Sequence, residues 1–154
     1  MGLQLGIIGY GGMGGFHHRN ASRIEGVQVI GAYDTDPVRV HAAEKNGIKG
    51  FSTLEELLSC DEINTVLVAV PNDKHMELCV EAANAGKHVI CEKPVAMNVR
   101  ELDQMIAAAG RNGKIFTVHQ NRRWDKDFRI VKKILDSGEL GKVYSIQSRL
   151  HGSG

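Results

Sequence analysis

Residues 3–14 read LQLGIIGYGGMG, a short apolar run followed at once by glycines at the spacing G-x-G-x-x-G. Each glycine of this pattern has a distinct role in a strand–turn–helix unit. Gly9 permits the tight turn, Gly11 lets the backbone approach a pyrophosphate, and Gly14 lets the helix pack on the strand. The helix that starts here presents backbone N–H groups to phosphates. The stretch therefore predicts a phosphate-binding turn between a strand and a helix.

A carboxylate follows this turn at the distance that a dinucleotide requires. Asp34 comes 20 residues after Gly14 and closes a second apolar run, residues 27–33. An acid in this place accepts hydrogen bonds from the adenosine ribose hydroxyls. Because Asp34 and the nearby Asp36 would repel a 2′-phosphate, we expect NAD in preference to NADP. Arg39 is the neighbouring cation that would favour NADP, although we expect it to face solvent.

Composition excludes several classes of protein. A chain of 154 residues can form one domain with a substantial core but is too short for two full ones. The 19 Lys and Arg residues nearly balance the 18 Asp and Glu residues, without a basic block, which argues against nucleic acid or an acidic membrane surface as partner. With no apolar run near the roughly 20 residues of a membrane span and no signal peptide, we expect a cytoplasmic protein.

The three cysteines indicate free thiols rather than a metal site. Cys60, Cys79 and Cys91 are odd in number and lack the spacing of metal ligands. Cys79 falls on an apolar helix face and Cys91 ends an apolar strand, so both are expected to be buried in their reduced form. We therefore expect no metal centre.

The fold class that the sequence predicts is α/β, a doubly wound Rossmann fold with a parallel sheet in the order 3-2-1-4-5-6. Strand patterns occupy residues 3–8, 27–33, 49–51, 64–70, 87–91 and 115–119. Two apolar stripes mark helices between strands, one formed by Met76, Cys79, Val80 and Ala83 and the other by Val99, Leu102, Ile106 and Ala109. Helix starts are predicted at Thr53 and Asn98, each followed three residues later by glutamate, and at Asp73.

The pattern changes after residue 119, so we assign residues 1–120 to the dinucleotide-binding domain and residues 121–154 to the start of an incomplete α+β domain. Asp125 is expected to cap a helix that runs through Leu135 and stops at Gly138. Residues 142–150 then alternate apolar and polar side chains, which is typical of a half-buried antiparallel strand.

Two further clusters follow predicted parallel strands, where ligands bind in open α/β sheets. They are Pro71-Asn72-Asp73-Lys74-His75 and the end of the block Ala85-Gly86-Lys87-His88-Val89-Ile90-Cys91-Glu92-Lys93-Pro94. Together with the glycine turn and His17 behind it, with Asn121-Arg122-Arg123-Trp124 and with Gly138-Glu139-Leu140-Gly141, they make the whole chain resemble the Gfo/Idh/MocA family of oxidoreductases.

The resemblance implies that Lys93 is the catalytic residue, beside the nicotinamide and the substrate. A lysine ammonium can hydrogen-bond a hydroxyl and stabilise the charge that develops as its proton leaves. Glu92 would orient Lys93 or contact the cofactor, Pro71 would shape its turn and Asn72 would face ribose hydroxyls. The residues assigned to the cofactor on these grounds are Gly9, Tyr10, Gly11, Gly12, Met13, Gly14, Asp34, Pro71, Asn72, His75, Glu92, Lys93 and Arg123.

The resemblance also implies a sugar or polyol substrate, a homo-oligomer, and a second domain whose aspartate and histidine take the substrate proton. Those two residues are not in this sequence, so we expect the chain to bind cofactor without appreciable dehydrogenase activity of its own. Two alternatives stay open: a dinucleotide-binding module that senses or regulates without turnover, and a lyase or hydrolase that uses NAD in a redox cycle. For single residues simpler roles compete, since Asn72 and Asp73 could only cap a helix and Glu92-Lys93-Pro94 could be a solvated strand end.

Overall fold

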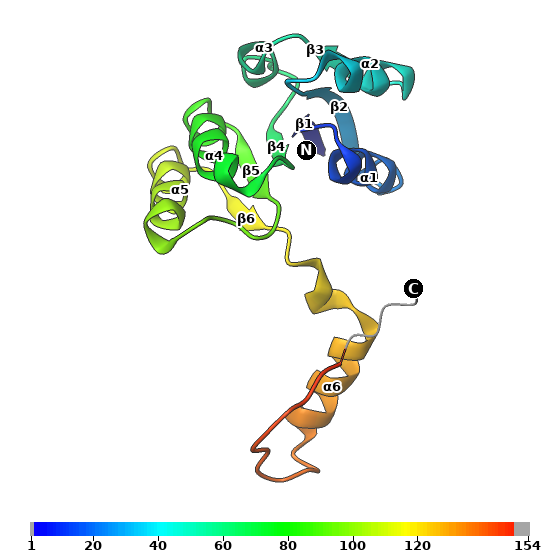
Figure 1. The fold of residues 1–154 in the computed structure, drawn as a ribbon, viewed down its shortest axis with the longest axis vertical. Helices are drawn as coiled ribbons and strands as arrows, with labels where there is room; N and C mark the ends of the chain where they lie inside the picture. Colours follow the sequence, from blue (N-terminus) through cyan, green and yellow to red (C-terminus); the bar gives the residue numbers. More distant parts are fainter. Residues whose placement is uncertain (1, 150–154) are drawn as a thin grey trace. The chain divides into compact units, whose positions relative to one another are not determined.

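The computed structural model describes residues 2–149, which form two compact units, one extending to His119 and the other starting at Gln120. The first unit contains a six-stranded sheet in the order β3-β2-β1-β4-β5-β6, with every neighbouring pair parallel (Figure 1). This is the predicted doubly wound order. The strands are β1 Leu3–Ile8, β2 Val27–Tyr33, β3 Lys49–Phe51, β4 Thr65–Val68, β5 His88–Cys91 and β6 Phe116–Val118.

Helices connect successive strands, as parallel pairing requires. They are α1 Gly12–Ala21, α2 Pro37–Lys45, α3 Leu54–Leu58, the short 3-10 helix η1 Asn72–Lys74, α4 His75–Asn84 and α5 Val99–Arg111. No helix within residues 2–149 is long and apolar enough to cross a bilayer.

The core lies on both faces of the sheet. Successive side chains of a strand alternate between faces, so Val66 and Val68 of β4 join one buried cluster while Leu67 joins the other. The first cluster also contains buried residues of α3, α4 and α5, and the second contains Ala43 of α2. This two-sided burial explains why β4 reads as a continuous apolar run.

Two of the three predicted helix starts are confirmed. The Thr53 hydroxyl accepts the Glu56 N–H at 3.1 Å, and the Asn98 carbonyl oxygen accepts the Glu101 N–H at 3.0 Å. The prediction for Asp73 was wrong, because Asp73 lies inside η1 and α4 begins at His75 without a side-chain cap. A 3-10 turn therefore takes the place of a capped start here.

The apolar face predicted for α5 needs a correction. Val99 and Ile106 are 73% and 52% exposed, whereas Met105, Ala108 and Ala109 are buried. The buried positions lie one helical turn apart and face α4, where two small alanines allow the helices to approach closely. The predicted stripe was therefore displaced around the helix axis.

The second unit contains the 3-10 helix η2 Asn121–Trp124 and α6 Lys126–Ser137. Gly138 ends α6 with φ +73°, the left-handed conformation expected of a glycine stop. Asp125 occupies the N-cap position of α6, as predicted, but its side chain makes no capping hydrogen bond and accepts one from Arg122 at 3.0 Å.

The strand predicted over residues 142–150 is not observed. Residues 142–149 pair with no strand among the described residues, and Leu150 lies outside them. A strand forms only when its backbone groups find a partner. The alternating pattern of this segment therefore shows a propensity for a strand, but the segment has no partner strand in the described part of the chain with which to form one.

Candidate dinucleotide-binding site

The glycine turn owes its shape to two positions that admit no side chain. Gly9 follows β1 with φ +90°, and a Cβ built on it would lie 2.5 Å from the Ala69 carbonyl oxygen. A Cβ on Gly14 would lie 2.0 Å from the Gly9 carbonyl oxygen. These contacts assign Gly9 to the junction of β1 with the end of β4, and Gly14 to the packing of α1 on the turn.

The other two positions of the turn leave open space at the start of α1. A Cβ on Gly11 would approach only the end of the Arg39 side chain, at 3.3 Å, and one on Gly12 would meet nothing within 4 Å. The Gly15 N–H donates to the Gly11 carbonyl oxygen at 2.9 Å. The N–H groups of Gly12, Met13 and Gly14 thus stand at the open helix start, where an anion binds most readily.

Asp34 binds the glycine turn as well as facing the cavity beside it. Its buried carboxylate accepts the Tyr10 N–H at 2.8 Å through Oδ2 and the Asp36 N–H at 2.9 Å through Oδ1. The Arg39 guanidinium lies 3.5 Å from Oδ2. Asp34 therefore fixes the turn after β1 to the turn after β2, a role that its spacing alone did not reveal.

Tyr10 was assigned to the cofactor, and the structure gives it another role. Its backbone N–H is taken by Asp34, and its buried side chain points into the protein. There the hydroxyl lies 2.6 Å from His18 Nδ1 and accepts a hydrogen bond from Asn46 at 3.2 Å. Burial, with the nearby Arg19, lowers the pKa of His18, which favours a neutral ring that can accept a hydrogen bond from the Tyr10 hydroxyl.

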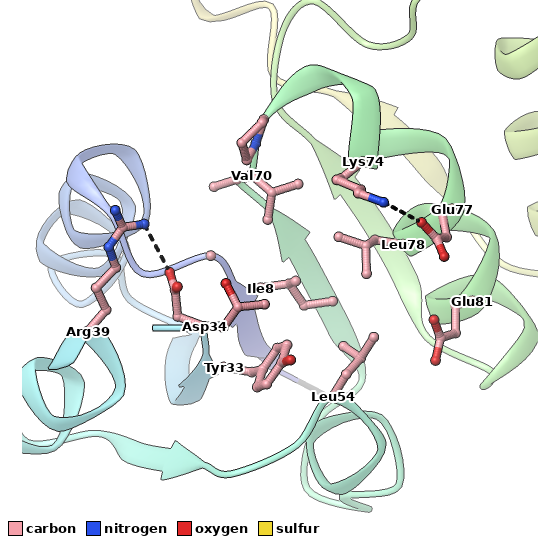
Figure 2. Close-up of a pocket in the computed structure, with 14 residues that line it drawn as sticks. Ile8, Tyr33, Asp34, Arg39, Leu54, Val70, Lys74, Glu77, Leu78 and Glu81 are labelled. Atoms are coloured by element: carbon pink, nitrogen blue, oxygen red, sulfur yellow. Dashed lines mark hydrogen bonds and ion pairs between the residues drawn. The ribbon is translucent and has the colours of Figure 1, made fainter. Parts of the chain in front are cut away.

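A cavity of about 480 Å³ opens beside Asp34, between the ends of β1 and β2 and the start of α4 (Figure 2). Polar groups flank it on two sides: Asp34 and Arg39 on one, Lys74, Glu77 and Glu81 on the other. Apolar side chains form much of its wall, namely Ile8, Leu54, Val70 and Leu78. Gly9 and Pro71 line it too, whereas Asn72 is exposed and is not among the lining residues.

His75 does not line this cavity, and its assignment to the cofactor stays a prediction. Its side chain is fully buried, and its two ring nitrogens each lie 3.0 Å from a backbone carbonyl oxygen, of Val70 and of Pro94. Burial opposes protonation, but the Cys91 side chain and the two carbonyls outweigh it and raise the pKa of His75. His75 joins the turn after β4 to the turn after β5.

A second polar cluster, which we call the Glu92 cluster, lies where β5 ends and consists of His17, Glu92 and His119. Glu92 Oε1 lies 2.6 Å from His17 Nε2 and 3.0 Å from His119 Nδ1, and Oε2 accepts the Lys93 N–H at 3.0 Å. The side chain of Glu92 is 6% exposed, whereas that of Lys93 is exposed. Burial acts to raise the pKa of Glu92, but the hydrogen bonds from His17 and from the Lys93 N–H, with His119 nearby, hold it below its usual value.

His119 was not identified from the sequence. The available signal was its position directly after β6, because the carboxyl ends of parallel strands meet at one edge of the sheet. His17 lies in α1, one helical turn after Gly14, and so reaches the same edge. The fold topology, rather than a local sequence pattern, brings both histidines to Glu92.

Two other residues of the sequence motifs are a buried lysine and an exposed arginine. Lys87 is buried and donates to the carbonyl oxygens of Cys60 and Ile63 at 2.9 and 2.8 Å, so it has a structural role. Arg123 lies in η2 of the second unit and is exposed. Its assignment to the cofactor stays a prediction.

Residues 3–120 match the sequence profile of the family described as "Oxidoreductase family, NAD-binding Rossmann fold". The chain belongs to the Gfo/Idh/MocA family. The resemblance inferred from the sequence is thereby confirmed, and this family membership makes the first unit an NAD-binding oxidoreductase domain.

Individual relatives agree with this membership. An inositol 2-dehydrogenase of Salmonella typhimurium is 34% identical over 97% of this chain, which spans 46% of that enzyme. The crystal structure of an NAD-binding protein from Listeria innocua has 42% identity and a TM-score of 0.88, over 92% of this chain and 42% of that one. That of the WlbA dehydrogenase from Bordetella pertussis, in complex with NADH and UDP-GlcNAcA, has 29% identity and a TM-score of 0.84, over 93% and 42%. This chain thus spans less than half the length of these relatives.

Proposed function

We propose that this chain is the cofactor-binding part of a dehydrogenase that transfers hydride between a nicotinamide cofactor and a CH–OH group of a sugar or polyol. The observation that carries the proposal is the alignment of three features on one sheet edge: the open glycine turn after β1, Asp34 after β2 and Lys93 after β5. The inositol 2-dehydrogenase and the NADH-bound WlbA relative support the reaction class.

The residues present suit a dinucleotide. The N–H groups at the start of α1 would hold the pyrophosphate, Asp34 the adenosine ribose, and the cavity beside it, with apolar walls at Leu54 and Leu78, the adenine ring. A nicotinamide held there would supply the acceptor for the hydride of the substrate carbon. Pro71 and Asn72 follow β4 and would shape the middle of the crevice.

The balance of charge around the cavity favours NAD over NADP. Asp34, Glu77 and Glu81 line it against Arg39 and Lys74, and Lys74 is paired with Glu77 at 3.3 Å. A 2′-phosphate beside Asp34 would bring like charges together. Arg39 is held by Asp34 and Asp36 at 3.5 Å each, which reduces its attraction for a phosphate.

Lys93 would act on the substrate. Its ammonium, exposed at the end of β5, would donate a hydrogen bond to the reacting hydroxyl and stabilise the negative charge that forms as the proton leaves. The C–H electron pair leaves as hydride, and the proton passes to a base. We propose that this base belongs to a second domain, which the unit from Gln120 onward begins, in a cytoplasmic homo-oligomer.

The test uses a protein that includes both domains. Lys93→Ala should lower kcat for sugar or polyol oxidation by at least ~100-fold, because general acid–base assistance is worth about 10²–10⁴, while the Kd for NADH changes little. The matched control Lys126→Ala, on α6, should leave both unchanged. A Lys93→Ala enzyme that retains full kcat would overturn the proposed role. If the wild-type protein binds NADH but oxidises no polyol, the sensing alternative is favoured.

A further inference from the structure

The Glu92 cluster contains a buried carboxylate next to the exposed lysine of the proposed catalytic turn. Removing a carboxylate from water is costly unless hydrogen bonds replace its hydration. Glu92 receives two of them: Oε1 is hydrogen-bonded to His17 Nε2 at 2.6 Å, and Oε2 accepts the Lys93 N–H at 3.0 Å. His119 Nδ1 lies 3.0 Å from Oε1 without making a hydrogen bond to it. The carboxylate therefore lies between the two imidazoles and the backbone of Lys93.

The two histidines come from separate elements and converge on one oxygen. His17 belongs to α1, and His119 follows β6, where its backbone N–H donates to the Cys91 carbonyl oxygen at 2.8 Å. Their rings meet edge to face with centroids 4.6 Å apart. His17 satisfies Glu92 only if its Nε2 carries the proton, whereas His119 Nδ1 is buried 3.0 Å from Oε1 without a hydrogen-bond partner among the residues that the structure describes. The cluster thereby fixes the tautomer of His17.

We propose that His17 and His119 are positioning residues that hold Glu92 ionised and fixed, so that its second oxygen anchors the Lys93 backbone and aims the lysine ammonium. This inference rests on the proposed function for Lys93 alone. The titratable groups that face Glu92 are His17 from α1, His119 after β6 and the Cys91 thiol of β5. The lowered pKa of Glu92 agrees with a carboxylate held ionised despite its burial.

The same three side chains are an alternative set of ligands for a divalent metal, since their donor atoms lie within 4.8 Å of one another. Glu92 Oε1 is instead hydrogen-bonded to His17 Nε2 at 2.6 Å. The other oxygen, Oε2, accepts the Lys93 N–H. Each oxygen of the carboxylate thus has a hydrogen-bond partner.

The experiment follows the Lys93 backbone amide of this chain by ¹⁵N NMR as the pH is lowered, with no cofactor present. Its shift reports the ionisation of Glu92, which accepts its N–H. In the wild type the midpoint should lie below the ordinary glutamate value of roughly 4.3. In the double variant His17→Ala/His119→Ala the midpoint of the Glu92 titration should rise by at least a pH unit, which corresponds to a tenfold gain in the proton affinity of Glu92. His119→Gln, which keeps an N–H donor, should recover part of the shift that His119→Ala causes.

His41→Ala serves as the matched control, because His41 is exposed and lies on α2. An unchanged midpoint in a folded double variant would overturn the proposal. If the double variant does not fold, a wild-type midpoint of the Glu92 titration above the ordinary glutamate value would also overturn the proposal. A midpoint that moves on adding Zn²⁺ or a chelator would replace it with a metal site. Since the titration needs neither cofactor nor turnover, its failure is distinct from a failure to bind NADH.

Discussion

The two ends of the proposed crevice are built by different means. At the adenosine end the backbone determines the shape of the site. Gly9 and Gly14 admit no Cβ, and the Asp34 carboxylate accepts hydrogen bonds from two backbone N–H groups. At the other end, side chains from α1, the end of β5 and the residue after β6 converge in the Glu92 cluster. The first end is encoded within 32 consecutive residues, Leu3 to Asp34, and the second is assembled from three distant segments.

This difference separates what each end contributes. Backbone donors at a helix start bind any phosphate that fits, so the adenosine end should supply most of the affinity for the cofactor. The Glu92 cluster is proposed to act on the orientation of Lys93. Changes at the first end should therefore appear in Kd, and changes at the second in kcat.

The largest effect on affinity is expected from Gly11→Val. A branched side chain at the open helix start occupies the space that the pyrophosphate needs, and overpacking of this kind costs about 1–3 kcal/mol, roughly 5- to 150-fold in Kd for NADH. The fold should survive, because a Cβ there meets only the flexible end of Arg39. Fluorescence titration with NADH measures the effect.

Gly15→Ala is the control for that change. Gly15 lies in α1, and its Cβ would touch only the end of Arg19 at 3.4 Å, so Kd should be unchanged. Normal NADH affinity in a folded Gly11→Val protein would place the phosphate site elsewhere.

Asp34→Ala should have the next largest effect. It removes the ribose contacts and also leaves the Tyr10 N–H without its partner, which together cost about 1–3 kcal/mol. NADH binding should weaken and the difference between NADH and NADPH should narrow. Asp34→Asn keeps an acceptor for one N–H and should lie between the wild type and Asp34→Ala; equal affinities in all three would remove Asp34 from the site.

Arg39→Ala should produce a smaller and selective change. The Arg39 guanidinium is about half exposed and already faces two carboxylates, so NADH affinity should change by less than about 1 kcal/mol. NADPH binding should weaken more than NADH binding, because Arg39 lies beside Asp34, where a 2′-phosphate would be placed. Calorimetry with both cofactors tests this, and a preferential loss of NADH would contradict it.

The smallest expected effect is on the pH dependence of the free energy of unfolding. His18 is buried as a neutral ring with a lowered pKa, so the unfolded chain takes up its proton first. The contribution of His18 to stability is therefore full above roughly pH 6.5 and is lost as the pH falls below it. His18→Gln should be less sensitive than the wild type to a change from about pH 7.5 to about 5.5, as measured by urea unfolding. A steeper loss in the variant would contradict the neutral ring.

The sequence predicted the sheet and the adenosine end because their determinants are local. Apolar runs placed the six strands to within two residues at each end, and the spacing of Gly9, Gly14 and Asp34 located the turn. The burial of His75 was not predicted because its position after β4 suggests exposure, whereas its ring nitrogens lie against two backbone carbonyl oxygens in the core. His119 was missed because its partner, Glu92, lies 27 residues away in the sequence and meets it only through parallel strand packing.

The central claim is most directly tested by calorimetric titration of this chain with NADH and, separately, with NADPH. We expect one site per chain and tighter binding of NADH, since Asp34, which lines the cavity, would accept hydrogen bonds from ribose hydroxyls and repel a 2′-phosphate. Binding of neither cofactor by the folded chain, or tighter binding of NADPH, would contradict it.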